Sequence, residues 1–213
     1  MCRSLKGSSV DSKPYAEPAQ QAPGGNRRPP LPVKVVIAGG FGVGKTTAVS
    51  AVSEIPLVTT EAAITEIAAE IDRTGEVPDK VTTTVALDFG RITIDDEIKL
   101  YLFGTPGQDR FGFMWHELTK GALGALVIVD TRRLDDCYAA VDYFEHTDVP
   151  FVVAVNRFHG MLAHEIEDVR WALAIGMETP IITFDARDRA SVVDALLSVL
   201  HRSLARATAT TSA

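Results

Sequence analysis

One glycine-rich stretch constrains the fold of this chain more than any other feature: Gly39-Gly40-Phe41-Gly42-Val43-Gly44-Lys45-Thr46. It follows an apolar run over residues 33–38, which predicts a buried strand. Residues 46–52 come next, with small and apolar side chains at helical spacing. A strand, a glycine-rich turn that ends in Lys-Thr, and a helix together form a phosphate-binding loop.

The residue types in this loop suit a bound triphosphate. Glycines allow successive backbone N–H groups to converge on phosphate oxygens, and the helix N-terminus adds a partial positive charge. We expect Lys45 to reach the terminal phosphates and the Thr46 hydroxyl to coordinate Mg²⁺. The alternative is a glycine-rich turn without a ligand, but the complete spacing and the flanking elements favour a nucleoside triphosphate site.

Charge and cysteine content narrow the class of protein. The chain has 213 residues and a net charge of −7, which argues against sequence-independent binding of nucleic acid. Cys2 and Cys137 lie far apart without metal-type spacing, so we expect reduced thiols in a cytoplasmic protein. No apolar run reaches transmembrane length.

The chain divides into three parts by composition. Residues 1–32 are rich in Pro, Gly, Ser and Gln and are expected to form a disordered extension, because they bury too little apolar surface to offset their ordering entropy. Residues 33–205 form the expected P-loop domain, and residues 206–213 a flexible C-terminal tail.

Within the domain, short β-rich runs alternate with helical patterns, which predicts an α/β fold with a mostly parallel sheet covered on both faces. Residues 84–94 and 97–103 are joined by a turn too short for a crossover, so they form a hairpin that adds one antiparallel edge strand. Residues 59–73 are predicted to be an amphipathic helix, since Ile64, Ile67, Ala68 and Ile71 recur at helical spacing. Further strands are expected near 124–130, 151–156 and 180–184, and further helices near 109–120, 135–146 and 163–175 and at the C-terminal end.

Ligands of open α/β sheets sit at the carboxyl ends of the strands, so the residues just after each strand are candidates for the site. These are the segments Gly104-Thr105-Pro106-Gly107-Gln108, Asn156-Arg157-Phe158-His159 and Asp185-Ala186-Arg187. By contrast, Asp130, Asp135, Asp136 and Asp142 are expected on a solvated acidic face.

The order of these motifs resembles the Ras-like small GTPases over residues 33–204. The run Thr84-Val85-Ala86-Leu87-Asp88-Phe89 is similar to the switch I strand of Rab and Arf proteins. The Thr-Pro-Gly-Gln segment and Val129-Asp130-Thr131-Arg132-Arg133 are closer to the bacterial polarity GTPases and closest to the conservon GTPases of filamentous actinomycetes. The resemblance implies a Ras-like P-loop fold, a GTP/GDP-operated switch with Mg²⁺, a roadblock-fold regulator and a membrane sensor kinase. The resemblance therefore implies a cytoplasmic protein that is held at the membrane surface by its partners.

The resemblance also implies roles for particular residues. Thr84 would close over Mg²⁺ and the attacking water as the switch I threonine, with Thr83 the alternative. Gly107 would donate its N–H to the γ-phosphate, and Gln108 would orient the hydrolytic water. Phosphate and magnesium would be held by Gly39, Gly42, Val43, Gly44, Lys45, Thr46 and Thr47.

Two positions depart from the family pattern. Gly104 stands where the family has a magnesium-binding aspartate, so we expect weaker metal affinity. His159 stands where an aspartate accepts two N–H groups from guanine, and a neutral imidazole offers one acceptor. The remaining base-site candidates are Asn156, Arg157, Asp185, Ala186 and Arg187. Guanine is expected, through the Ala186 N–H, with adenine as the alternative.

Three functions are compatible with these motifs. The first is a nucleotide-operated switch with slow GTP hydrolysis, and the second is a nucleotide-binding scaffold that barely hydrolyses. The third, an ATP-dependent kinase, lacks a lid-like cluster of arginines. Phe111, Phe113, Met114 and Trp115 either pack on the sheet or form an exposed patch for a partner.

Overall fold

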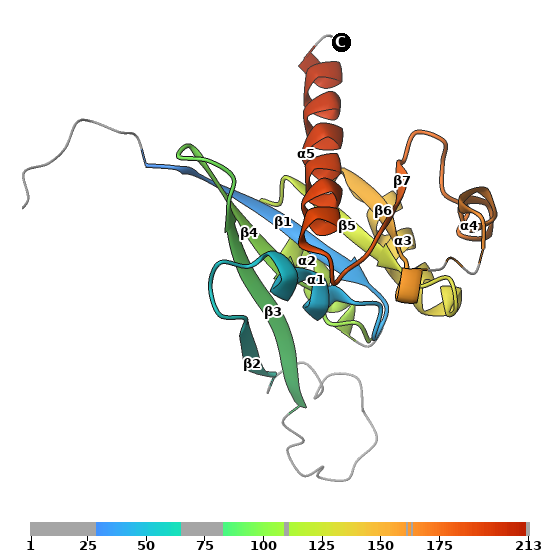
Figure 1. Ribbon diagram of the computed structural model, residues 1–213, viewed down its shortest axis with the longest axis horizontal. Coiled ribbons are helices and arrows are strands. Elements are labelled where there is room, and N and C mark those ends of the chain that lie inside the picture. The colour runs from blue at the N-terminus through green and yellow to red at the C-terminus, as the bar shows by residue number, and fades with distance from the viewer. Residues whose placement is uncertain (1–28, 65–82, 109–110, 161, 163, 212–213) are drawn as a thin grey trace, which may run out of the picture.

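A seven-stranded sheet forms the centre of the part of the chain described by the computed structural model, residues 29–64, 83–108, 111–160, 162 and 164–211 (Figure 1). The strand order is β2-β3-β4-β1-β5-β6-β7. Strand β3 runs antiparallel to both neighbours, and the other neighbouring strands pair in parallel. The strands are β1 (Leu31–Gly39), β2 (Val58–Ile64), β3 (Thr83–Thr93), β4 (Ile98–Gly104), β5 (Gly124–Val129), β6 (Phe151–Asn156) and β7 (Ile181–Phe184).

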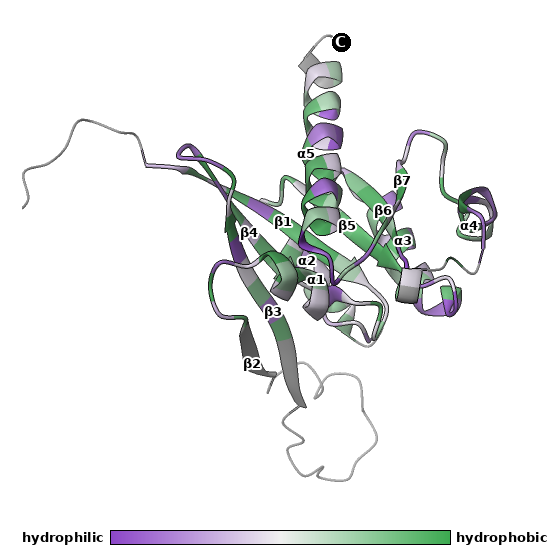
Figure 2. Cartoon of the chain, viewed as in Figure 1, coloured by the Kyte–Doolittle hydropathy of each residue, from purple (hydrophilic) through white to green (hydrophobic). Residues whose placement is uncertain are grey.

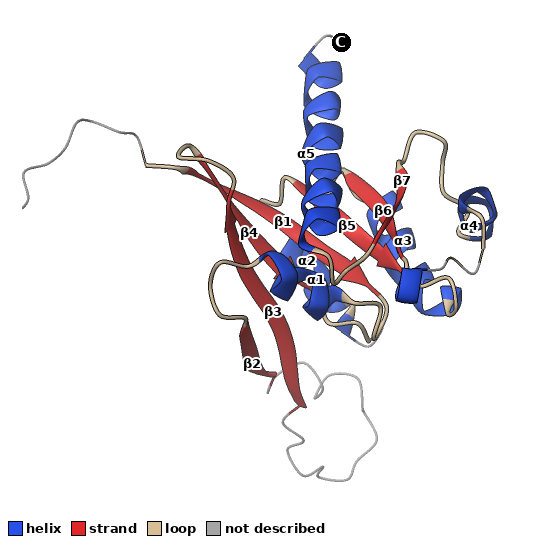
Figure 3. Ribbon diagram, viewed as in Figure 1, coloured by secondary structure: helices blue, strands red, loops and turns tan. Residues whose placement is uncertain are grey.

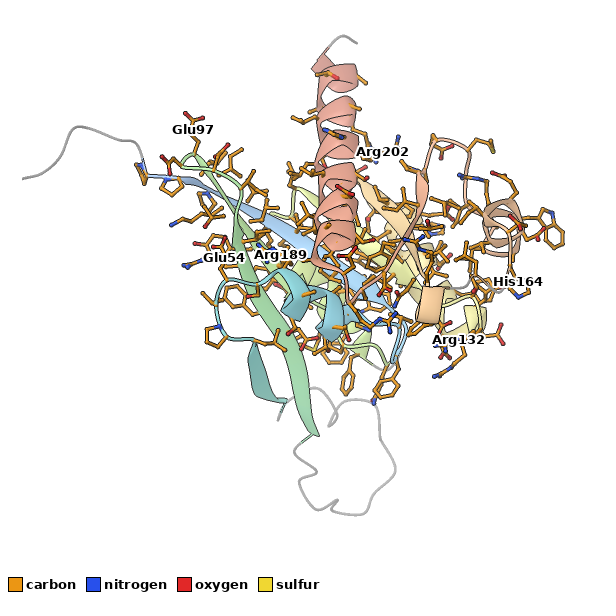
Figure 4. All side chains as sticks on the ribbon, in the orientation of Figure 1. Glu54, Glu97, Arg132, His164, Arg189 and Arg202 are labelled. Carbon is orange, nitrogen blue, oxygen red and sulfur yellow. The ribbon has the colours of Figure 1, made fainter. Side chains whose placement is uncertain are left out.

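Helices cover both faces of this sheet (Figure 3). On one face α1 contacts β1, β3 and β4, and α5 contacts β5, β6 and β7. Arg189, at the start of α5, donates to the Val52 carbonyl at the end of α1 at 2.8 Å, which ties the two helices together (Figure 4). The helices are α1 (Lys45–Val52), α2 (Phe113–Thr119), α3 (Tyr138–Glu145), α4 (Ile166–Ala172) and α5 (Arg189–Thr211), with short 3₁₀ turns η3 (Leu134–Cys137) and η4 (Phe158–Gly160).

The core lies along the central strands, where the hydrophobic residues gather in Figure 2. Every residue of β5 and of β6 is buried, as expected for parallel strands with helices on both faces. Strand β1 lies between β4 and β5, so the order of the strands reverses at β1. The carboxyl end of β1 is therefore the topological switch point at which open α/β sheets bind ligands.

The structure confirms the predicted α/β fold with a mostly parallel sheet and corrects two details. The hairpin β3–β4 forms, but β3 is not an edge strand because β2 pairs with its outer side. Residues 58–64 form that strand rather than the start of a helix. Val58, Thr59 and Thr60 are β-branched, which favours a strand, and they precede the residues whose spacing predicted a helix. The outer edge of β3 provides a strand with which they pair. Residues 65–73 of the predicted helix lie outside the described residues.

The first and last elements of the described fold extend slightly past residues 33 and 205, the limits predicted for the domain, whose division into three parts stays a prediction. Strand β1 begins at Leu31, two residues before the predicted start of the domain. Helix α5 continues to Thr211, so residues 206–211 are helical rather than part of a flexible tail. The predicted extension over residues 1–28 lies outside the described residues.

The packing of β5 predicts a large effect of truncating Leu126, which is fully buried between the two helical layers. Leu126→Ala is expected to lower the free energy of unfolding by about 2–5 kcal/mol, through lost apolar burial and the cavity left behind. The exposed Leu204 on α5 gives a matched control, because Leu204→Ala removes the same atoms from the surface. Urea unfolding followed by circular dichroism measures both, and equal losses would contradict this packing.

Candidate functional site

The glycine-rich loop at the end of β1 adopts a backbone that only glycine accepts without strain. Gly39, Gly42 and Gly44 have φ values of 132°, 74° and 108°, in the region that side chains with a Cβ rarely adopt. Helix α1 starts directly after Gly44, and no side chain in the described part of the chain caps its N-terminus. The first-turn N–H groups of α1 are thus available to an anion, as a phosphate-binding loop requires.

Lys45 folds back beneath this loop. Its ammonium donates to the carbonyls of Gly39 at 2.8 Å and Gly40 at 2.5 Å, and the residue is buried. Burial lowers the pKa of Lys45 to about 8, although Asp88 and Cys137 act to raise it. The charge is therefore held in place at the loop, where a phosphate would stabilise it.

A carboxylate that the sequence analysis did not identify lies beside the predicted magnesium ligand. The exposed Thr46 hydroxyl donates to the Asp88 carboxylate at 2.5 Å, and Asp88 belongs to β3, the neighbour of β4. The sequence signal was weak, because Asp88 lies inside a strand rather than at its end. The alternation of the strand places Asp88 on the same face as Gly90 and the buried Ile92, which is the face that packs against α1, so the strand pattern alone does not single out Asp88.

The Pro-Gly-Gln segment lies against the phosphate loop. Thr105 donates its backbone N–H to the Ile37 carbonyl at 2.9 Å, which fixes the start of the segment beside β1. A Cβ on Gly107 would lie 2.6 Å from Lys45 Nζ and 2.7 Å from the Gly40 oxygen, so only glycine fits at this approach. The structure thus brings Gly107 and Lys45 together, as their predicted roles at the γ-phosphate require.

The residues after Gly107 divide between the core and the surface. The Gln108 side chain is exposed, and its backbone carbonyl accepts the Phe111 N–H at 3.0 Å. Phe111 and Trp115 are buried, whereas Phe113 is 46% exposed. Phe111 and Trp115 therefore follow the first alternative, packing in the interior, whereas Phe113 is exposed and its contact with a partner stays a prediction.

The predicted base-reading segments are tied to the phosphate loop through Asn156. This buried amide donates to the Val43 carbonyl at 2.9 Å and accepts the Ala186 N–H at 3.2 Å. The N–H that the sequence analysis assigned to guanine is thus engaged by Asn156 in this structure. The arrangement joins the ends of β6 and β7 to the loop after β1, and it makes one continuous site from three strand ends.

Asp185 and Arg187 pair with each other at the edge of this site. The Arg187 guanidinium donates to both carboxylate oxygens of Asp185, at 3.0 and 2.8 Å. These hydrogen bonds lower the pKa of Asp185 to about 2. The carboxylate is therefore ionised at neutral pH, and its lone pairs are already engaged by Arg187.

Asp130 lies in the protein interior rather than on the expected solvated face. It is buried at the end of β5, and Arg132 donates to both of its carboxylate oxygens, at 2.9 and 2.7 Å. The Arg132 guanidinium also stacks 3.8 Å from the centroid of the Phe158 ring (Figure 4). This pair braces the segment that follows Asn156, because an ion pair and a cation–π contact share one guanidinium.

Two predicted site residues are placed only in part. Thr84 pairs with Ala63 in the β2–β3 ladder, and its side chain lies outside the described residues. His159 forms part of η4, and its side chain is likewise outside them. Thr47 and Arg157 are described, the first exposed on α1 and the second half-buried after β6. These assignments stay predictions.

The fold and the loop together define a nucleotide-binding P-loop NTPase. A strand, the glycine-rich turn, a buried lysine and a helix stand at the switch point of a mostly parallel sheet, as this class requires. Among the described residues, no helix is long and apolar enough to cross a membrane.

Comparisons with known proteins agree with this class. The chain belongs to the family described as conserved hypothetical ATP binding protein, whose model matches residues 37–206. It is 34% identical over 127 residues to an uncharacterized protein of Methanocaldococcus jannaschii, a match covering 59% of this chain and 70% of that protein. Its fold is similar to the G-domain of FeoB from Methanococcus jannaschii, with a TM-score of 0.53, 11% identity, and coverage of 81% of this chain and 98% of the other.

The lowered pKa of Lys45 predicts that nucleotide affinity falls as the pH rises above about 8. Phosphate oxygens raise the pKa of the bound ammonium, so above pH 8 the free protein must take up a proton on binding. We expect about a tenfold loss of affinity between pH 7 and pH 9.

Titration of a fluorescent nucleoside triphosphate at pH 7, 8 and 9 measures this dependence. Lys45→Arg is the control, since its guanidinium stays charged and its profile should be flat. A flat wild-type profile would contradict the lowered pKa.

Proposed function

We propose that this chain is a GTP-operated molecular switch that hydrolyses its nucleotide slowly. The observation that carries the proposal is the contact of Gly107 with Lys45 and the phosphate loop. A backbone N–H at this position can bond to a γ-phosphate but not to a diphosphate, so the Pro-Gly-Gln loop takes a different position in each state. This is the property that distinguishes a switch from a simple nucleotide carrier.

The hydrolytic step transfers the γ-phosphoryl group to water. The Lys45 ammonium, held at the loop by the Gly39 and Gly40 carbonyls, would neutralise charge on the terminal phosphates, and Gln108 would orient the attacking water. Mg²⁺, when bound, neutralises phosphate charge, and the Thr46 hydroxyl would hold it together with Thr84 from the switch strand. Because the Gln108 side chain is exposed, it is not pre-organised, and hydrolysis is expected to be slow until a partner orders the loop.

Exposed aromatic side chains near this loop provide a surface for such a regulator. Phe41 on the phosphate loop is 62% exposed, and its Cα lies close to Gly107. Phe113, at the start of α2, is also largely exposed. We propose that the regulator docks here, and the resemblance to conservon GTPases makes a roadblock-fold protein, with a sensor kinase in the same complex, the first partner to test.

Guanine is the proposed base, with adenine as the second candidate. The order of the Asn-Arg-Phe-His and Asp-Ala-Arg segments supports guanine, and Asn156 holds both segments against the phosphate loop. The description of the family as ATP binding and the absence of a carboxylate at position 159 favour adenine. A site that lacks the double acceptor discriminates weakly between the two purines.

The proposed hydrolytic role predicts that Gln108→Ala reduces single-turnover GTP hydrolysis on the order of 10–100-fold, while nucleotide affinity stays close to wild type. The exposed His116 on α2 supplies the control, because His116→Ala leaves the loop intact. Phosphate release from preloaded protein is the measurement. Equal rates for Gln108→Ala and wild type would favour the scaffold that binds nucleotide and barely hydrolyses it.

Restoring the double acceptor predicts a change in base preference. His159→Asp is expected to raise the ratio of GTP affinity to ATP affinity by at least about tenfold, because guanine then pairs both of its edge N–H groups. His164→Asp adds the same charge at an exposed position after η4 and should leave the ratio unchanged. Competition of GTP and ATP against a fluorescent nucleotide gives the ratio, and an unaltered ratio in His159→Asp would argue against guanine.

A further inference from the structure

The end of β4, where the family pattern has a carboxylate and this chain has Gly104, lies beside an aspartate of the neighbouring strand. In the antiparallel pair β3–β4, Asp88 is the direct partner of Gly104, the position at which the carboxylate was expected. Side chains of directly opposed residues point to the same face of a sheet. A carboxylate on Asp88 therefore reaches nearly the same space as one on residue 104.

The space beside Gly104 is filled by this carboxylate. A Cβ on Gly104 would lie 2.9 Å from the Asp88 Cβ and 3.2 Å from its Oδ2. The two positions cannot both carry a side chain without displacing one of them, since real Cβ contacts are longer than 3.0 Å. Gly104 and Asp88 are thus complementary: the glycine leaves the room that the aspartate uses.

The packing of α1 on β3 brings the carboxylate to the phosphate loop. Gly90, two residues after Asp88 and on the same face, lies so close to α1 that a Cβ would be 2.6 Å from Val49 Cγ1. Phe89 packs with Tyr101 and Phe103 on the opposite face. This approach is what allows the 2.5 Å hydrogen bond between Thr46, in the first turn of α1, and Asp88.

We infer that Asp88 is the acidic magnesium-binding residue of this site and replaces, from β3, the carboxylate missing at Gly104. The inference rests on the proposed binding of nucleotide with Mg²⁺. By accepting the Thr46 proton, Asp88 directs the lone pairs of that hydroxyl outward, where a cation would lie. One carboxylate is enough, because Mg²⁺ takes most of its ligands from phosphates and water. Among the described residues, no cluster of three or more His, Cys, Asp or Glu side chains offers another metal site.

Asp88→Asn separates a metal-binding role from a structural one. The amide oxygen still accepts the Thr46 proton, so the fold and metal-free nucleotide affinity should be retained, whereas the charge that binds Mg²⁺ is lost. We measure the dissociation of a fluorescent nucleoside diphosphate, of whichever purine binds more tightly, as a function of Mg²⁺ concentration. The midpoint is the Mg²⁺ concentration at which dissociation is slowed by half of its full range. This concentration is expected to rise at least tenfold in Asp88→Asn. Asp194→Asn, which removes an exposed charge on α5, should leave it unchanged.

The second test moves the carboxylate from one strand to its neighbour. The double variant Asp88→Gly/Gly104→Asp moves the carboxylate to β4 and should recover a midpoint within about threefold of wild type, whereas Asp88→Gly alone should not. Two outcomes would overturn this inference alone. One is an unshifted midpoint in Asp88→Asn, and the other is a change in nucleotide dissociation that is equal with and without Mg²⁺. Failure of the wild-type protein to bind labelled nucleotide even at saturating Mg²⁺ would instead overturn the proposed function.

Discussion

The buried ammonium group of Lys45 organises the site. Its hydrogen bonds to the carbonyls of Gly39 and Gly40 hold the phosphate loop in the shape that points backbone N–H groups outward. A buried charge of this kind is costly unless it is paired, and in the described structure its partners are carbonyl dipoles and the nearby Asp88. A triphosphate supplies the missing negative charge, so the loop is stabilised most when it is loaded.

The same residue links the sensing loop to the fold. The Gly107 backbone packs close to the Lys45 ammonium because the Thr105 N–H is hydrogen-bonded to β1. Helix α2 begins six residues after Gly107, at Phe113. Under the proposed function, a γ-phosphate bound beside Lys45 would contact the Gly107 backbone and so influence the position of the segment that leads into α2. Sub-ångström changes at a packed contact of this kind are what switch proteins amplify.

Much of this structure could be predicted from the sequence, and the exceptions share one cause. Residues 35–38 of β1, 124–129 of β5 and 151–155 of β6 are apolar throughout, so burial between two helical layers is visible in the residues themselves. The glycine loop is equally local. The segment 58–64 was misread because its partner, β3, is distant in sequence, and the pairing decides the outcome where propensity is weak.

The role of Asp88 was missed for the same reason. Nothing near Asp88 in sequence shows that Gly104 is its partner, since register between two strands is a property of the pair. The bridge from Asn156 to Val43 and Ala186 spans more than a hundred residues, so only its individual members could be found from the sequence. The family match adds the class of protein and the structural comparison supports the fold, while the roles of single residues are proposals argued from the contacts.

The central claim is that the Lys45 ammonium completes an anion site in the glycine loop. The most direct test is isothermal titration of a nucleoside triphosphate into wild-type protein and Lys45→Ala, in buffer without divalent metal, with circular dichroism to confirm the fold of the variant. Lys45→Ala is expected to bind at least about thirtyfold more weakly than the wild type, because it removes one partner of a buried charged contact. Equal affinity of the two proteins would contradict it.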